Sequence, residues 1–462
     1  MGSGIRVCVQ GLGFVGAAMA VSIASARDAD GAPLYSVTGV DLPTEGGQER
    51  IRRLASGEFP FRTADPELVA ATADAHRAGN LTATSDPAAF EQAEIVVIDV
   101  HLDVDGSPSQ ASVDFGPLRA AVRTVGERIA AGTLVILETT VPPGTSQHVV
   151  APVLAEEFER RGLPADGFLL AHSYERVMPG KDYLASIVRF WRVYAGHTEA
   201  AADACERFLS SVIHVEEFPL TRLRSTTASE TAKLMENSYR AANIALVDEW
   251  SRFAEGVGID LFEIVDAIRV RPTHANLRQP GFGVGGYCLT KDPLLAGVGA
   301  RQLFDRDDLA FPFAELAVAT NQAMPLATVD AVRRALGGDV AGRRVALLGV
   351  AYREDVADTR FTPAQVFVEM LRAEGADVAC HDPMVEHWEE LAEDVGPAFP
   401  DPSSCDCLVL GVSHAAYREQ DWLGWLQRAR PAIIDANRVL SRDTVEALRH
   451  AGASVAVVGA GS

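Results

Sequence analysis

A glycine pattern near the N-terminus constrains the fold more than any other feature of the chain. The apolar run at residues 5–10 leads into Gly11-Leu12-Gly13-Phe14-Val15-Gly16, and a stretch of small residues follows. Between a strand and a helix, such glycines allow a tight turn, close approach of the backbone to a pyrophosphate, and close packing of the helix on the strand. The pattern predicts a dinucleotide-binding Rossmann domain. The alternative is a Rossmann turn of the same shape that binds no nucleotide.

An acidic residue closes the second expected strand. Residues 35–40 form an apolar run that ends at Asp41. A carboxylate at this position accepts hydrogen bonds from the ribose hydroxyls of adenosine and disfavours a 2′-phosphate. The sequence therefore predicts NAD rather than NADP. The expected cofactor contacts in this part of the chain are Gly11, Gly13, Phe14, Val15, Gly16 and Asp41.

A second glycine-rich segment leads into a cysteine. Residues 280–293 read Pro-Gly-Phe-Gly-Val-Gly-Gly-Tyr-Cys-Leu-Thr-Lys-Asp-Pro, so Lys291 and Asp292 lie one turn after Cys288. A nearby cation stabilises the thiolate, which is the attacking form of cysteine. Taken alone, the segment fits a glycine-rich turn with a buried, inert cysteine equally well. The N-terminal fingerprint favours a nucleophilic Cys288.

Composition limits the class of protein. The chain has 462 residues, of which 48% are apolar and 23% charged, and its net charge is −22. This length predicts two or three domains, and the negative charge argues against nucleic acid or an anionic membrane as a partner. Nothing at the N-terminus resembles a signal peptide, no apolar run reaches about 18 residues, and the cysteines show no metal-binding spacing. We therefore expect a cytoplasmic protein with reduced thiols and no metal site.

The alternation of strand-like and helix-like segments divides the chain into three parts. Residues 1–215 alternate as in a parallel α/β sheet, strand signals disappear over residues 216–335, and alternation resumes over residues 336–462. We expect an α/β protein with two Rossmann-like, doubly wound parallel sheets joined by a central helical domain. The first turn of the second sheet lacks the full glycine triplet, so this sheet need not bind a dinucleotide.

The central part contains a long predicted helix with two polar residues among small and apolar neighbours. Lys233 and Asn237 are four residues apart, so both project from one face of this helix. They either line a site or belong to a solvated polar stripe. A helix that links two α/β domains is also a plausible dimer surface.

With these motifs assembled, the chain resembles the UDP-glucose/GDP-mannose dehydrogenase family, the nucleotide-sugar 6-dehydrogenases, over essentially its whole length. The cysteine loop carries the resemblance, supported by Thr-Val-Pro-Pro-Gly-Thr at 140–145, Glu-Arg-Val-Met-Pro-Gly at 175–180, the 230–237 segment and Asp-Thr-Arg at 358–360. Members of this family oxidise the C6 alcohol of a sugar nucleotide to a carboxylate with two NAD per turnover. The resemblance thus implies a UDP-sugar substrate, bound by the third domain, and a homodimer or larger homo-oligomer.

The resemblance also implies catalytic roles. Cys288 matches the family's nucleophile, Glu175 the carboxylate linked to thioester hydrolysis, and Thr140 a hydroxyl that orients water. The proton-transfer and oxyanion group of the family is matched by Lys233, Asn237 and Asp292. Thr140 and Lys291 complete the expected cofactor contacts.

Further residues match the family's substrate contacts. Arg360 and Arg438 lie where the third domain holds the sugar nucleotide, and either Arg271 or Arg278 would reach the site of a neighbouring subunit. The full set of expected substrate contacts is Glu175, Arg176, Lys233, Asn237, Arg271, Arg278, Gly285, Arg360 and Arg438.

Departures from the family pattern concern the sugar rather than the reaction. Val100-His101-Leu102-Asp103 replaces Val-x-Thr-Pro, and His101 is either a catalytic acid or an accommodating loop residue. The glycine loop resembles that of the branch acting on UDP-N-acetylhexosamines, although Tyr287 stands where that branch has histidine. A UDP-linked hexose with an open C2 substituent is expected.

Two other classes of function compete with this interpretation. Two-electron hydroxyacid-type dehydrogenases share a Rossmann domain and a Lys–Asn pair on a helix, but they need no nucleophilic cysteine. A non-catalytic subunit that binds NAD or a nucleotide sugar would keep the fold without the reaction.

Overall fold

The computed structural model describes residues 4–396 and 398–461. The chain forms two compact units, one made of Met1–Glu236 with Leu294–Phe311, the other of Asn237–Pro293 with Pro312–Ser462. Helix α8 (Thr226–Val257) begins in the first unit and ends in the second. The three domain ranges expected from the sequence remain predictions.

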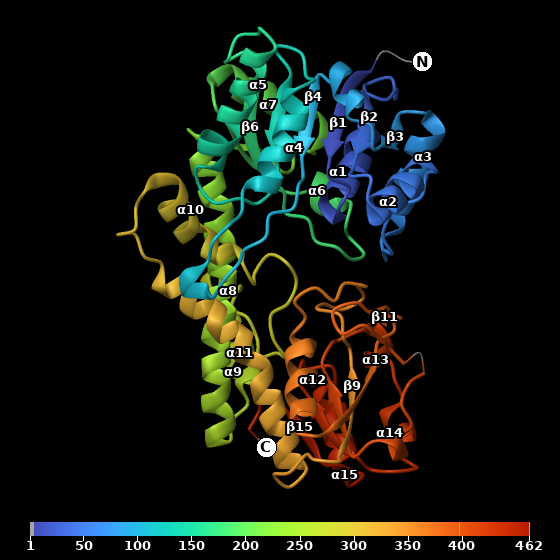
Figure 1. The fold of residues 1–462 in the computed structure, drawn as a ribbon. Coiled ribbons are helices and arrows are strands. Elements are labelled where there is room, and N and C mark those ends of the chain that lie inside the picture. The colour runs from blue at the N-terminus through green and yellow to red at the C-terminus, as the bar shows by residue number, and fades with distance from the viewer. Residues whose placement is uncertain (1–3, 397, 462) are drawn as a thin grey trace. The chain divides into compact units, whose positions relative to one another are not determined.

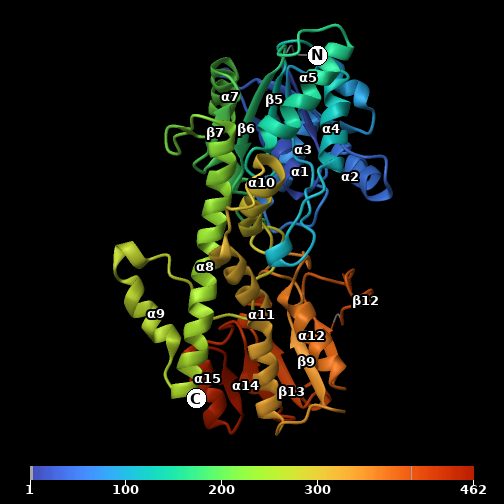
Figure 2. The same ribbon diagram turned by 60° about the vertical axis from the view of Figure 1, so that its left-hand side comes forward.

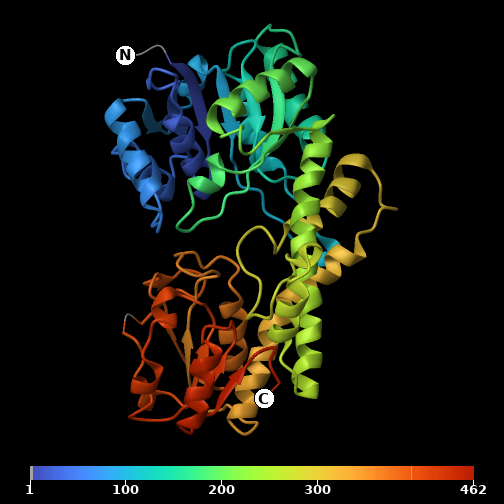
Figure 3. The same ribbon diagram turned by 180° about the vertical axis from the view of Figure 1, so that it is seen from behind.

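The first unit contains an eight-stranded sheet in the order β3-β2-β1-β4-β5-β6-β7-β8. The first six strands follow the Rossmann order. Views from opposite sides show helices covering both faces of the sheet (Figure 1 and Figure 3). Its strands are β1 (Ile5–Gln10), β2 (Tyr35–Val40), β3 (Leu81–Thr84), β4 (Ile95–Ile98), β5 (Leu134–Leu137), β6 (Leu169–Tyr174), β7 (Val193–Gly196) and β8 (Thr221–Arg222).

The helices of this unit pack closely because their buried faces are small or amphipathic. Helix α1 consists largely of alanine, glycine and valine and is buried from Gly16 to Ala24, which brings it tightly onto the sheet. The remaining helices are α2 (Glu45–Ala55), α3 (Pro66–Ala78), α4 (Gly116–Gly126), α5 (Ala151–Arg160), α6 (Ala185–Val188), α7 (Glu199–Val212) and α10 (Leu295–Phe304).

One edge of the sheet departs from the expected parallel alternation. Strand β7 runs antiparallel to β6, with His172 paired to Ala195. The segment between these strands holds only the four-residue helix α6. It therefore lacks the long helix that usually forms a parallel crossover.

The second unit contains a five-stranded parallel sheet in the order β10-β9-β13-β14-β15. This is the flavodoxin-type order, in which ligands collect at the switch point between the first and third strands of the sheet in chain order, here β9 and β13. The strands are β9 (Arg344–Leu348), β10 (Asp377–His381), β13 (Cys407–Leu410), β14 (Ala432–Asp435) and β15 (Val455–Val457). The second doubly wound sheet expected from the sequence is thus confirmed.

Helices and a small hairpin complete this unit, as Figure 2 shows. Phe367 of α12 packs with Val345, Leu347 and Val409 of the sheet in one apolar core. The elements are α9 (Leu261–Arg269), α11 (Pro312–Ala335), α12 (Pro363–Ala373), α13 (Ala415–Arg418), α14 (Trp422–Trp425), α15 (Arg442–His450) and the hairpin β11 (His387–Trp388) with β12 (Glu393–Asp394). Among the described residues, no helix combines the length and the apolar character needed to cross a bilayer.

Candidate active site

The glycine turn after β1 has the geometry of a pyrophosphate cradle. Gly11 has φ +92°, and a Cβ there would lie 2.4 Å from the carbonyl oxygen of Asp99. A Cβ on Gly16 would lie 1.9 Å from the carbonyl oxygen of Gly11, whereas one on Gly13 would meet no atom within 4 Å. The first turn of α1 starts at this exposed Gly13, and no side chain caps it. Its backbone is therefore open to an anionic group at the helix N-terminus, which fits NAD.

Asp41 follows β2 next to this turn. Its Oδ2 accepts a hydrogen bond from the backbone N–H of Leu12 at 3.3 Å and pairs with Nε of Arg50 at 2.8 Å. The ring of Phe14 stacks on Phe61 with centroids 4.0 Å apart, and Val15 lies half-buried on the same first turn. The six cofactor residues expected from the N-terminal sequence therefore gather at the carboxyl ends of β1 and β2.

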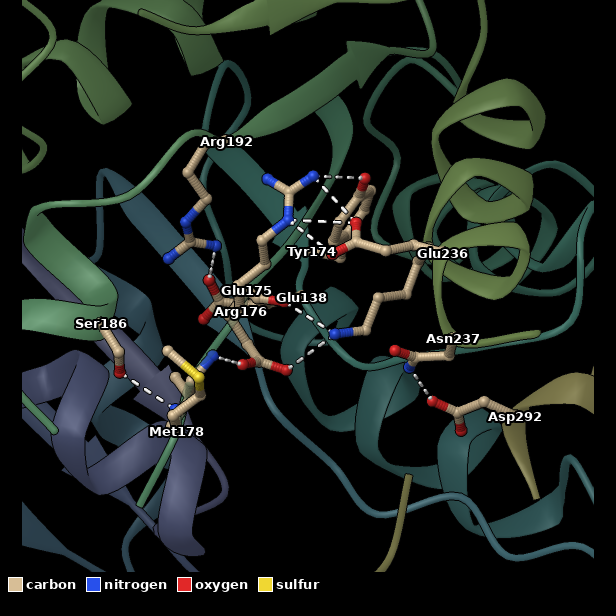
Figure 4. A network of polar contacts seen from close by, with 12 residues as sticks. Glu138, Tyr174, Glu175, Arg176, Met178, Ser186, Arg192, Glu236, Asn237 and Asp292 are labelled. Atoms are coloured by element: carbon tan, nitrogen blue, oxygen red, sulfur yellow. Dashed lines mark hydrogen bonds and ion pairs between the residues drawn. The ribbon is translucent and has the colours of Figure 1, made fainter. Parts of the chain in front are cut away.

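A buried acidic pair lies beneath the turn, and the sequence analysis did not identify it. Glu138, directly after β5, forms an ion pair with Arg192, and both side chains are 2% exposed (Figure 4). Asp99, directly after β4, has an enclosed Oδ2. Burial, followed by the charge and a hydrogen bond of Glu138, raises the pKa of Asp99 well above its usual value. The signal for these acids was their position at the ends of buried strands.

Glu175 and Lys233 meet in the first unit. Nζ of Lys233 donates to the backbone carbonyl of Glu175 at 2.8 Å and lies 3.5 Å from its Oε1. Oε2 of Glu175 accepts from the backbone N–H of Val177. Both side chains are about nine-tenths buried. The structure thus brings together two of the expected catalytic residues, while Thr140 lies half-buried just after β5.

Arg176 is engaged by its protein neighbours. Its Nε donates to both carboxylate oxygens of Glu236 at 3.0 Å (Figure 4). Its Nη1 donates to the carbonyl of Trp191. Its guanidinium also lies 5.2 Å from the ring centroid of Tyr174. These contacts fix the segment after β6 against α8.

In the second unit, Asp292 follows the cysteine closely and forms a continuous network with Lys291 and Asn237. Nδ2 of Asn237 donates to Oδ2 of Asp292 at 2.7 Å (Figure 4). Nζ of Lys291 lies 3.0 Å from Oδ1 of the same carboxylate. Nζ of Lys291 also lies 4.4 Å from the ring centroid of Tyr287. The carbonyl of Cys288 accepts the N–H of Asp292 at 2.9 Å. Asp292 is thus aligned by both of its neighbours.

Cys288 itself is exposed at the end of a firmly anchored loop. Phe282, 2% exposed, fixes the start of the loop in the apolar core, with its ring centroid 5.6 Å from that of Phe367. A Cβ on Gly285 would lie 2.6 Å from Cβ of Tyr352, so the glycine permits close packing there. Burial, followed by the charges of Asp358 and Cys288, raises the pKa of Tyr352 to about 12.

The expected substrate arginines lie in different surroundings. Arg360 pairs with Asp358, its Nη2 2.7 Å from Oδ2, and its guanidinium lies 5.8 Å from the ring centroid of Tyr287 in the cysteine loop. Arg438 lies 4.7 Å from the ring centroid of Phe262. Arg271 and Arg278 are exposed. Partial desolvation of the Arg278 guanidinium, together with the nearby charges of Arg240 and Arg269, lowers the pKa of Arg278.

Two histidines of the first unit differ in environment. His101 is exposed, and its Nε2 lies 3.8 Å from Oδ1 of Asp103. His172 is buried, and burial followed by the charge of Lys233 lowers its pKa to about 3. Its Nδ1 lies 2.8 Å from the hydroxyl of Ser229 on α8. His172 is therefore a neutral structural link at neutral pH.

Three family models match the chain in order. The NAD binding domain of the UDP-glucose/GDP-mannose dehydrogenase family matches residues 5–212, its central domain residues 227–323, and its UDP binding domain residues 346–442. Together these matches cover most of the chain.

Individual relatives are similar over nearly their whole length. UDP-N-acetyl-D-mannosamine dehydrogenase from Pyrococcus horikoshii is 29% identical to this chain, over 96% of this chain and 97% of the relative. A structure of UDP-D-ManNAc dehydrogenase from the same organism has a TM-score of 0.83 and covers 98% of this chain and 99% of its own. UDP-N-acetyl-D-glucosamine 6-dehydrogenase from Pseudomonas aeruginosa is 26% identical over 95% and 98%. An NDP-N-acetyl-D-galactosaminuronic acid dehydrogenase from Methanosarcina mazei Go1 has a TM-score of 0.78 at 29% identity over 100% and 96%. This chain belongs to the UDP-glucose/GDP-mannose dehydrogenase family and is an NAD-dependent oxidoreductase.

Proposed function

We propose that the chain oxidises the C6 alcohol of a UDP-linked N-acetylhexosamine to the corresponding UDP-uronic acid in a four-electron reaction. The observation that carries the proposal is the exposed Cys288 at the end of an anchored glycine loop. Lys291 and Asp292 lie just after it and form a network with Asn237 of α8. The substrates named for the relatives above favour an N-acetylated sugar. The cytoplasmic location expected from the sequence remains a prediction.

Cys288 allows the second half of the reaction. An aldehyde is a poor hydride donor until a nucleophile adds to it. The Cys288 thiolate attacks the carbonyl carbon, so a C–S bond forms and the carbonyl oxygen becomes the oxyanion of a thiohemiacetal. Loss of a hydride from this adduct leaves a thioester, and attack by water then releases the acid and regenerates the thiolate. Two NAD molecules, bound in turn at the glycine turn after β1, would accept the two hydrides.

Glu175 and Lys233 are suited to the proton and charge steps. The Glu175 carboxylate is nine-tenths buried beside Lys233 and can accept the proton of the attacking water. Lys233 and Asn237 lie on one face of α8 and carry N–H donors of the type that stabilises an oxyanion. Arg360 and Arg438 are proposed to bind the diphosphate, whose charge a chain of net −22 must meet with local cations.

The experiment that tests this function measures NADH released per mole of limiting sugar nucleotide. UDP-ManNAc, UDP-GlcNAc, UDP-glucose and GDP-mannose are compared, because they differ in the C2 substituent, the C2 configuration or the base. We expect two NADH per sugar with a UDP-N-acetylhexosamine. One NADH per sugar would mean that the reaction stops at the aldehyde, and the role given to Cys288 would then be wrong.

We further propose that α8 forms a homodimer interface. In the second unit, one face of this helix exposes apolar side chains at spacings of seven, four, three and four residues, each more than half exposed: Tyr239, Leu246, Trp250, Phe253 and Val257. Such a stripe follows the helical repeat, and contiguous exposed apolar surface marks sites of protein–protein interaction.

Trp250→Glu is expected to turn the dimer into a monomer. A buried tryptophan at the centre of an interface often contributes about 2 kcal/mol or more, and a carboxylate there would be desolvated. Light scattering coupled to size exclusion gives the mass. Leu423→Glu, at a half-exposed apolar residue of α14 in the same unit, is the matched control and should leave the mass unchanged. A wild-type protein that is monomeric would contradict the proposal.

A further inference from the structure

The first turns of α8 make a row of contacts with strand β6 and with the segments that follow β5 and β6. The residues involved are spaced so that they share one face of the helix. Two of these contacts, at Lys233 and Glu236, are described above. The other two lie one turn earlier, at Ser229 and Glu230.

Glu230 binds two backbone N–H groups of the turn after β5. Its Oε2 accepts from Gly144 at 2.6 Å and its Oε1 accepts from Ser146 at 2.8 Å. The residue is 1% exposed. Charge-assisted bonds of this length in a buried setting are among the stronger hydrogen bonds in proteins.

Between Pro142 and Ser146, the turn has only one other backbone N–H group. Pro142 and Pro143 carry no N–H, and the N–H of Thr145 reaches the carbonyl of Pro142 at 3.2 Å. A helical segment begins at Ser146 and continues into α5, so the Glu230 carboxylate also lies where the helix dipole favours negative charge. Glu230 is therefore the side chain that completes this turn.

The opposite side of the turn is packed against α10. A Cβ on Gly144, whose φ is +93°, would lie 2.7 Å from the ring of Phe304, and one on Gly299 would lie 2.8 Å from the backbone of Pro143. The turn is thus confined on one side by α10 and tied on the other to α8. It begins at Thr140, and α8 carries Lys233 one turn after Glu230.

We propose that Glu230 is a positioning residue, which fixes the turn bearing Thr140 at a set distance from the helix bearing Lys233. The link between His172 and Ser229 provides a second tie, from the neighbouring strand β6 to the same helix turn. The consequence for catalysis rests on the proposed function, because that function places Thr140 and Lys233 in one reaction. A displacement of about 1 Å between such groups can cost about 100-fold in rate.

Glu230→Gln is the discriminating variant. The amide keeps the size of the side chain but has one acceptor oxygen, so one of the two N–H groups would face an NH2 group. Glu249→Gln, at an exposed position on the same helix, is the matched control. Burial raises the pKa of Glu230 above its usual value, although the hydrogen bonds from Ser146 and Gly144 oppose this shift.

Two measurements test the proposal, both well below the melting temperature so that every molecule is folded. We expect kcat of Glu230→Gln to fall by about 10- to 100-fold while KM for NAD changes by less than about twofold, with part of the rate restored in Glu230→Asp. We expect amide hydrogen exchange over residues 144–150 to accelerate in Glu230→Gln and not in Glu249→Gln.

Different results would contradict different parts of the proposal. Wild-type exchange in Glu230→Gln would overturn the tie itself, and accelerated exchange with wild-type kcat would overturn its importance for the reaction. Failure of the wild-type enzyme to reduce NAD with any sugar nucleotide would instead reject the proposed function. The exchange experiment would then still establish or overturn the tie between Glu230 and the turn.

Discussion

Replacement of Cys288 by serine is expected to lower the rate of uronic acid formation by about three orders of magnitude or more. A serine hydroxyl in this position is a much weaker nucleophile than a thiolate, because its pKa lies far above neutral. The aldehyde would then not be converted into an adduct that can lose a second hydride. Product analysis by mass spectrometry distinguishes acid from aldehyde in single-turnover mixtures.

The same cysteine should be the most reactive thiol of the protein. Among the described residues, Cys288 is the only exposed cysteine. Burial raises the pKa of Cys8 and Cys380 to about 12 and that of Cys405 to about 11, and it raises the pKa of Cys205 and Cys407 as well. One equivalent of iodoacetamide should therefore modify Cys288 first, and peptide mapping would locate the label.

A matched substitution separates the nucleophile from a general effect of thiol loss. Cys380→Ser, at a half-buried position in β10, is expected to keep the wild-type stoichiometry of NADH to sugar. Should Cys288→Ser still release two NADH per sugar, the thioester route would be wrong. The two-electron dehydrogenase class considered at the outset predicts one NADH per sugar in both the wild type and Cys288→Ser, since it needs no cysteine.

Lys233→Met is expected to lower kcat by about 100- to 1,000-fold, the range seen when one oxyanion donor is removed. Methionine approximates the length of the side chain but carries no donor and no charge. The variant loses the 2.8 Å hydrogen bond from Nζ of Lys233 to the backbone carbonyl of Glu175, and the Glu175 carboxylate loses its buried counter-ion. Steady-state kinetics measures kcat, and an unchanged far-ultraviolet circular dichroism spectrum shows that the variant is folded.

The control for this variant lies on the same helix. Thr231→Ala changes an exposed side chain that hydrogen-bonds only within α8, to the carbonyl of Thr227, and should leave kcat within about twofold of wild type. A Lys233→Met enzyme with wild-type kcat but a raised KM for the sugar would assign Lys233 to substrate binding alone. That result would leave the oxyanion steps to Asn237 and other donors.

The N-terminal domain and its cofactor could be predicted from the sequence because their signals are local. Gly11, Gly13 and Gly16 lie within six residues, and each is needed for a backbone reason that any strand-turn-helix would impose. The family models confirm the NAD assignment. The shared face of Lys233 and Asn237 follows from the helical repeat in the same way, since residues four apart lie above one another.

Contacts between distant segments could not be predicted from these patterns. Arg192 lies 54 residues from its partner Glu138, and the pairing depends on the order of the strands rather than on any local spacing. The sequence predicted that Lys291 would stabilise the Cys288 thiolate. In the structure its Nζ contacts Asp292 and Tyr287, and its effect on the thiolate remains a prediction.

By itself, the sequence determined the fold class, the cofactor and the residue types that the reaction needs, because glycine turns, buried strands and helix faces are read within a few neighbouring positions. Only the tertiary structure decided what positions those residues. Glu230 shows the difference: it stands three residues before Lys233 in a motif that the sequence displays, yet its partners, Gly144 and Ser146, lie 86 and 84 residues away. Burial and hydrogen bonding of a carboxylate depend on which distant backbone groups the fold brings to it, and no local pattern encodes them.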